Sequence, residues 1–167
     1  MSKARFNVGF QDETKMTRAF LLSLFCLTLL AGCASTQQPR VEHLNSGKVL
    51  PDGFPFSEAV RVDNTLYLSG MVGVKPQTLE LVSGGIEAES HQTMKNIRLM
   101  LEAHGASMAD VVKCVVMLAD ISEWGTFNQV YKTYFKDRYP ARSALGANGL
   151  ALGARVEVEC LAVTQER

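Results

Sequence analysis

One apolar run, VVKCVVMLA at residues 111–119, constrains the fold of this chain more than any other segment. A near-continuous apolar run of this kind is typical of a β-strand that is covered on both faces. Amphipathic helices are predicted on either side of it along the chain, one over residues 86–104 and one from Ser122 to Phe135. Both faces of the sheet that contains this strand therefore need apolar cover.

Short β-prone segments precede and follow this central unit. FSEAVRV and TLYLS, at residues 56–62 and 65–69, are predicted to form a hairpin. Two further strands are predicted over residues 142–145 and 154–163. The order ββαβαββ predicts an α+β sandwich in which both helices cover one face of a mixed β-sheet.

The other face of the sheet has no third layer in a chain of this size, so we expect copies of the chain to cover it as a homo-oligomer. The last predicted strand contributes to this face. Its residues Arg155, Glu157 and Glu159 point to one side, away from the alternating apolar positions. These charged side chains are either hydrated or paired inside an interface, and both interpretations stay open.

The N-terminal region carries a processing signal. Residues 19–31 are uncharged and strongly apolar, follow Lys15 and Arg18, and are too few to span a bilayer. The run ends in Leu-Ala-Gly-Cys at residues 30–33, which resembles the bacterial lipobox. That resemblance implies cleavage before Cys33, which then carries diacylglycerol and an amide-linked acyl chain such as palmitate. The alternatives are an ordinary signal peptide or a buried helix that happens to end in cysteine.

We therefore expect three parts: a lipoprotein signal peptide at residues 1–32, a lipidated tether at 33–52 and a folded domain at 53–167. Residues 1–15 are interpreted as a mis-assigned start, because Met16 would open a typical lipoprotein signal directly. Ala34 after the cysteine resembles lipoproteins sorted to the outer membrane. The expected location is thus periplasm-facing, with the membrane as a partner through the N-terminal lipid.

Composition excludes other classes of function. The 17 basic and 17 acidic residues balance, which argues against a nucleic-acid surface. After removal of the leader and lipidation of Cys33, the thiols of Cys114 and Cys160 remain. Each lies in an apolar strand-like run, so packing as free thiols in the core is the preferred interpretation. Pairing as a disulfide in an oxidising compartment is the alternative.

Few motifs in the sequence carry chemistry. His91 and His104 fall on different sides of the predicted helix and cannot share a metal ion, and no nucleotide-binding or Ser-nucleophile pattern appears. The segment YPARS, at residues 139–143, is followed by Glu157. The arginine of this segment offers a planar fork for a carboxylate, and a glutamate in a partly dry crevice can deprotonate a water.

With these motifs the chain resembles the Rid family, the YjgF-like reactive-intermediate deaminases. The resemblance spans residues 53–163 and rests on PFSEAVRVDNTLYLSGMVGV, the GGIEAESHQTMKNIRLMLEAHG helix, YPARSAL and ARVEVECLAV. It implies a chorismate-mutase-like fold and a homotrimer with three active sites at subunit interfaces. It also implies hydrolysis of 2-imino acids, such as 2-iminobutanoate and 2-iminopropanoate, to 2-oxo acids and ammonia without a metal or cofactor.

The resemblance also implies roles for individual residues. Arg142 matches the arginine that binds the substrate carboxylate, and Glu157 matches the glutamate that positions the attacking water. Gly70 matches a glycine whose backbone lines the site. Ser69 and Asn128 match positions near the pocket.

Two positions depart from the family pattern. Phe56 stands where many members have tyrosine, which removes a phenol from the site, and Ala144 stands where many have cysteine after PARS. The function predicted from the sequence is imine hydrolysis on a small 2-imino acid. The alternative is an envelope-anchored binding module that holds small carboxylates or 2-oxo acids without turnover.

Overall fold

The computed structural model describes residues 38–165, and the predicted signal peptide and the start of the lipidated tether, residues 33–37 with Cys33, lie outside that range. The compact unit begins at Pro39. Its strands and two α-helices follow the order β1 (Val41–Leu44), β2 (Ala59–Val62), β3 (Thr65–Leu68), β4 (Met71–Val72), α2 (Gly85–Ala103), β5 (Val111–Leu118), α3 (Trp124–Lys132), β6 (Ala141–Gly146) and β7 (Val156–Val163). Short 3₁₀ turns lie at Met108–Asp110, Ile121–Glu123 and Ala151–Gly153.

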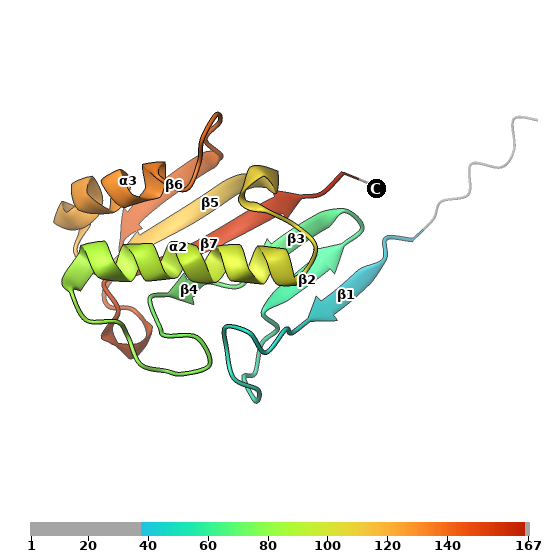
Figure 1. The fold of residues 1–167 in the computed structure, drawn as a ribbon, viewed down its shortest axis with the longest axis horizontal. Coiled ribbons are helices and arrows are strands. Elements are labelled where there is room, and N and C mark those ends of the chain that lie inside the picture. Colours follow the sequence, from blue (N-terminus) through green and yellow to red (C-terminus); the bar gives the residue numbers. More distant parts are fainter. Residues whose placement is uncertain (1–37, 166–167) are drawn as a thin grey trace, which may run out of the picture. The chain divides into compact units, whose positions relative to one another are not determined.

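All strands join one mixed sheet with the order β1-β2-β3-β7-β5-β6, and β4 also pairs with β7. The β5–β6 pair is parallel and the other pairs are antiparallel. Helices α2 and α3 cover the same face of this sheet (Figure 1). The predicted α+β sandwich with a mixed sheet and two helices on one face is confirmed.

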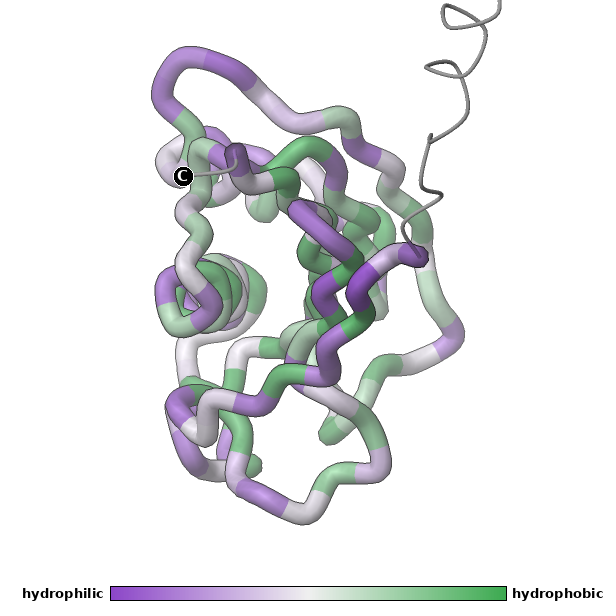
Figure 2. Tube along the Cα trace, turned by 90° about the vertical axis from the view of Figure 1, so that its right-hand side faces the viewer, coloured by the Kyte–Doolittle hydropathy of each residue, from purple (hydrophilic) through white to green (hydrophobic). Residues whose placement is uncertain are grey.

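The core lies between the helices and the sheet. Figure 2 shows α2 nearly end on, to one side of the strands. The fully buried side chains of this layer include Met94, Ile97, Met100 and Leu101 from α2, Val116 and Leu118 from β5, and Val156 and Val158 from β7. The alternation predicted for the last strand is confirmed, because its apolar side faces the helices and Glu157 and Glu159 do not.

The second face of the sheet is open in the single chain. Apolar side chains remain exposed along it, with Tyr67 at 48% and Val163 at 37% of their full accessibility. On β5, Val115 and Met117 are only partly buried, whereas Val116 and Leu118 between them are fully buried. The apolar character on both sides of β5 thus has intramolecular cover on one side alone, as the sequence predicted.

The boundary predicted at residue 53 is wrong, because the fold begins earlier. Residues 41–44 form β1, which pairs antiparallel with β2 at one edge of the sheet. Val49 is fully buried in the core. The sequence concealed this strand because it is short, lies at an edge and carries polar residues, and because its partner is a distant segment.

Glu58 and His104 fix this early segment to the domain. The Glu58 carboxylate is almost fully buried, accepts a hydrogen bond of 2.8 Å from the Ser46 hydroxyl and lies 3.1 Å from His104 Nε2. The contact joins the β1–β2 connection to the C-terminal end of α2. His104 therefore has a structural partner that sequence reasoning did not find.

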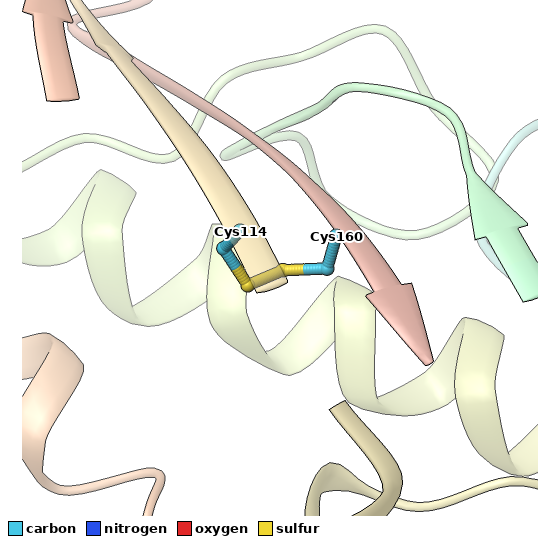
Figure 3. Close-up of a disulfide and its surroundings, with 2 residues drawn as sticks. All are labelled: Cys114 and Cys160. Carbon is cyan, nitrogen blue, oxygen red and sulfur yellow. A yellow bond between two sulfur atoms is a disulfide. The ribbon is translucent and has the colours of Figure 1, made fainter. Parts of the chain in front are cut away.

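A disulfide joins Cys114 of β5 to Cys160 of β7 (Figure 3). The two residues are directly opposite each other in the antiparallel register, with their Cα atoms 4.1 Å apart. Both are 1% exposed. Burial in the core was predicted correctly, but the preference for free thiols was wrong, because the strand register brings these two side chains together.

Candidate active site

Arg142 projects from β6, the edge strand next to α3. It is the register partner of Cys114, so its side chain lies on the face of the sheet that carries the helices. Its guanidinium carbon lies 4.6 Å from the centre of the Tyr131 ring and 5.8 Å from that of Trp124. Among the described residues it has no ion pair with a carboxylate. The N–H groups of its fork are therefore available to an anionic ligand.

An open cavity of about 260 Å³ lies beside this arginine. Its lining consists of Asn128, Tyr131, Lys132, Tyr139, Pro140 and Arg142. The lining includes two cationic side chains and no carboxylate, so it favours anions over cations. Burial raises the pKa of Tyr131 to about 12, although the Arg142 charge opposes this, so the phenol stays neutral at ordinary pH.

Glu157 lies on β7, in the middle of the sheet. Its register partners are Val72 of β4 and Met117 of β5. Burial raises the pKa of its carboxyl group, and the like charge of Glu159 raises it further. A carboxylate with a raised pKa is a better proton acceptor, which suits a general base.

Gly70 packs directly against this carboxylate. A Cβ atom at Gly70 would overlap Oε1 of Glu157 and would lie 3.1 Å from its Cδ. The neighbouring strand β4 is held in place by Asn96 of α2, a fully buried residue. Its amide donates hydrogen bonds to the carbonyls of Val72 at 3.2 Å and Val74 at 2.8 Å. The absence of a side chain at Gly70 is therefore what leaves room for the Glu157 carboxylate.

Arg142 and Glu157 lie on opposite faces of the sheet within one chain. Arg142 is level with Cys114, which points toward the helices, and Glu157 is level with Met117, three residues further along β5. Side chains an odd number of residues apart on a strand point to opposite faces. A small substrate cannot contact both residues of the same chain.

The other predicted site residues divide between these two places or lie apart from them. Asn128 lines the Arg142 cavity, and Ala144 lies two residues after Arg142 on the same side of β6. Ser69 precedes Gly70, and its hydroxyl donates a hydrogen bond of 2.7 Å to the carbonyl of Ser57. Phe56 is 46% exposed and contacts neither the cavity lining nor Glu157 among the contacts described; its ring packs at a tilt against Phe54, with the ring centres 5.1 Å apart.

Comparison with known proteins identifies the family. A sequence model described as Endoribonuclease L-PSP matches residues 50–164. The human protein named 2-iminobutanoate/2-iminopropanoate deaminase is 45% identical over 109 residues, which cover 65% of this chain and 80% of the human one. The chain belongs to the Rid, or endoribonuclease L-PSP, family.

Solved structures of the Rid family share the fold. The crystal structure of RidA from the Antarctic bacterium Psychrobacter sp. PAMC 21119 has a TM-score of 0.70 and 36% identity, covering 74% of this chain and 99% of that one. The YjgF gene product of E. coli has a TM-score of 0.69 and 26% identity over similar shares of 74% and 99%. The YjgF-like fold predicted from the sequence is thereby confirmed.

Sequence reasoning missed the aromatic support of Arg142 in this Rid domain. In the sequence, Trp124 and Tyr131 are apolar positions of the amphipathic helix predicted from Ser122 to Phe135, and that pattern assigns them to the core only. They are seven residues apart, which places them on the same side of α3 after about two turns. The spacing was visible, but only the position of β6 beside α3 shows that this side faces an arginine.

Two further observations concern the residues the structure describes. Within residues 38–165, no three His, Cys, Asp or Glu side chains are grouped so as to hold a metal ion. The helices of the same range are too short or too polar to cross a membrane.

Proposed function

We propose that this chain hydrolyses 2-imino acids, with 2-iminobutanoate and 2-iminopropanoate as representative substrates, to 2-oxo acids and ammonia. The observation that supports it most is the Arg142 fork, which lies over Tyr131 with no carboxylate partner in the described part of the chain. A substrate of this class carries a carboxylate next to the C=N carbon. Relatives at 45–47% identity bear the name of this activity.

The proposed active site is shared between two copies of the chain. Arg142 and Glu157 face opposite sides of the sheet, so a complete site needs Arg142 of one copy and Glu157 of another. The open face of the sheet supplies the apolar area for such contacts, with Tyr67, Leu145 and Val163 exposed. We propose a homotrimer, which is the assembly that the resemblance to the Rid family implies. When the surface that carries Arg142 binds the surface that carries Glu157 of the next copy, three copies close into a ring with three equal sites.

In the proposed mechanism, Arg142 holds the carboxylate by two parallel N–H···O hydrogen bonds, which fixes the position of the C=N carbon. Glu157 takes a proton from a water molecule while the water oxygen bonds to that carbon and the C=N electron pair moves to nitrogen, and Glu157 then gives this proton to the nitrogen, which forms the carbinolamine. In the second step Glu157 takes the hydroxyl proton as the C=O bond forms, the C–N bond breaks, and this proton is passed to the departing nitrogen, which leaves as ammonia. The sum is imine plus water to ketone plus ammonia, so the residues of the chain suffice and no oxidant is consumed.

Phe56 and Ala144 adjust this proposal. If Phe56 occupies the tyrosine position at the site of an adjacent copy, it offers an apolar wall in place of a phenol, and substrates with apolar side chains are then favoured. Ala144 lies on the edge strand β6, where backbone groups are not all used by the sheet and can bind a ligand. We therefore assign to Ala144 a role for its backbone only.

We also propose that the mature chain is anchored to the outer membrane through lipidated Cys33 and faces the periplasm. The buried Cys114–Cys160 disulfide supports export, because disulfides persist in oxidising compartments. Labelling of cells with a palmitate analogue tests this proposal. The full chain should incorporate label and the Cys33→Ala variant should not. Label retained in the variant, or precursor that begins before Met16, would contradict the corresponding part of the proposal.

The activity is tested with the chain from Ala34 and freshly generated 2-iminobutanoate, with ammonia release as the readout. Arg142→Ala should lower kcat/KM by about a hundredfold or more, because two charge-assisted hydrogen bonds are lost. Glu157→Gln should lower kcat by about 10²–10⁴-fold while 2-oxobutanoate still binds. Arg138→Ala, which changes an exposed arginine outside the cavity lining, is the matched control.

The outcomes separate the two candidate functions. Full activity of Arg142→Ala would exclude the proposed role of that residue. Saturable binding of 2-oxobutanoate by the wild-type chain without any turnover would support the binding module instead. Sedimentation of the same samples checks that each variant keeps the oligomeric state of the wild-type chain.

A further inference from the structure

We propose that the ring of Tyr131 positions the Arg142 guanidinium for carboxylate binding, an inference that rests on the proposed function of Arg142. An arginine side chain has many rotamers, and fixing it costs conformational entropy. Salt bridges often fix arginines, but the described residues provide none for Arg142. The contact that remains is with aromatic rings, and Tyr131 is the closer of the two at 4.6 Å.

This contact leaves the binding edges of the fork free. A guanidinium over a ring face is attracted by the negative face of the ring and stacks through its own flat surface. The N–H groups lie in the guanidinium plane, so stacking does not consume them. A carboxylate partner inside the protein would occupy the same N–H groups that the substrate needs. An aromatic ring therefore holds the guanidinium without occupying the N–H groups that bind the substrate, whereas a carboxylate partner would occupy them.

Tyr131 is itself rigid enough to act as such a support. It is 3% exposed and stands in a row of aromatic rings on and after α3, with centroid distances of 5.6 Å to Phe127 and 4.8 Å to Phe135. Trp124, the second aromatic side chain near Arg142, is 45% exposed and lies further away at 5.8 Å. The buried ring thus fixes the position, and the exposed ring adds a longer contact.

The hydroxyl group of Tyr131 has no part in this role. It is buried and has no hydrogen-bond partner among the described residues. Since burial keeps the phenol neutral, as its raised pKa indicates, it provides no negative charge for the arginine. The ring face is then the only feature of Tyr131 that acts on Arg142, which separates the effect of the ring from that of the hydroxyl.

Three variants of the chain from Ala34, which contains the whole compact unit, test the proposal. Tyr131→Phe keeps the ring and removes only the hydroxyl, so we expect KM for 2-iminobutanoate and Kd for 2-oxobutanoate to rise clearly less than in the ring-deleted variant. Tyr131→Leu removes the ring, and we expect both constants to rise by about three- to thirtyfold while kcat changes less, from the size of cation–π interactions at partly buried sites. Tyr131→Met, which introduces a longer and more flexible apolar side chain of similar volume, replaces Tyr131→Leu if that variant does not fold.

The results distinguish this proposal from the proposed function. Unchanged constants in the ring-deleted variant, or an equal loss in Tyr131→Phe, would overturn the positioning role even if the wild-type chain is an efficient deaminase. If the wild-type chain shows no turnover but binds 2-oxobutanoate, and only the ring-deleted variant loses binding, the deaminase proposal fails and the positioning role stands. A wild-type chain that does neither refutes both.

Discussion

The two halves of the candidate site are built in different ways. Arg142 lies on an edge strand and is held by aromatic side chains of α3, whereas Glu157 lies on the central strand β7 and packs against the backbone of Gly70. The Arg142 half is adaptable, because it is held by side chains, which can shift or be replaced. The second is stiffer, because β7 is paired with β4 and β5 at Glu157 and the space for the carboxylate exists only while residue 70 has no side chain. The region proposed to bind the substrate thus tolerates substitutions better than the region proposed to activate water.

Gly70→Ala tests the stiff half most severely. The new Cβ would overlap the Glu157 carboxylate, and the carboxylate or β4 must move. A shift of a catalytic group by about 1 Å costs on the order of a hundredfold, so kcat should fall by about that factor while 2-oxobutanoate still binds at Arg142. Gly125→Ala is the matched control, since a Cβ there has no atom within 4 Å. Equal kcat values in both variants would show that Glu157 is as adaptable as Arg142.

The disulfide joins the strand beside Arg142 to the strand of Glu157, and its removal tests whether the two halves depend on it. Replacing Cys114 and Cys160 together by alanine should lower the free energy of unfolding by about 2–4 kcal/mol, measured by urea denaturation. The reduced wild-type chain, which keeps both side chains, controls for lost packing. We expect little change in KM at 25 °C. Two reactive thiols in the denatured, unreduced chain, when that chain was exported to an oxidising compartment, would contradict the disulfide itself.

The smallest expected effect concerns the charge next to Glu157. Burial and the Glu159 carboxylate both raise the pKa of Glu157. A general base must be ionised, so kcat/KM should decline as the pH falls through this raised pKa. Glu159→Gln removes the like charge and lowers the pKa of Glu157, so the acidic limb of the pH profile should move to lower pH. An unmoved limb would assign the titration to another group.

The hydrophobic periodicity of the sequence was sufficient to predict which helices and strands form the two layers of the fold. The alternation along β7 and the helical spacing in α2 each depend on a single element, and both were predicted with nearly correct bounds. The edge strand β1 was missed, because its four residues show no such pattern on their own and gain their order from pairing with β2. Elements whose order comes from a distant partner are the ones that local patterns do not reveal.

The candidate site was predictable in its residues but not in its geometry. The resemblance to the Rid family named Arg142 and Glu157, yet only strand register shows that they face opposite sides of the sheet. Strand register also places Cys114 opposite Cys160, so that the two form a disulfide. The sequence alone shows only that each lies in an apolar run. The contact of Tyr131 with Arg142 arises because α3 packs beside β6. No hydrogen-bond pattern in either segment reveals that packing.

The burial of the disulfide has a practical consequence for anyone who prepares this protein. With both sulfur-bearing residues 1% exposed, an oxidant reaches them only while the sheet and α2 are still apart. Chain made in a reducing cytoplasm would therefore close its core around two thiols and keep them through purification in air. Such a preparation and the exported protein would have the same sequence and fold but different resistance to heat, and mass spectrometry of the intact chain would tell them apart.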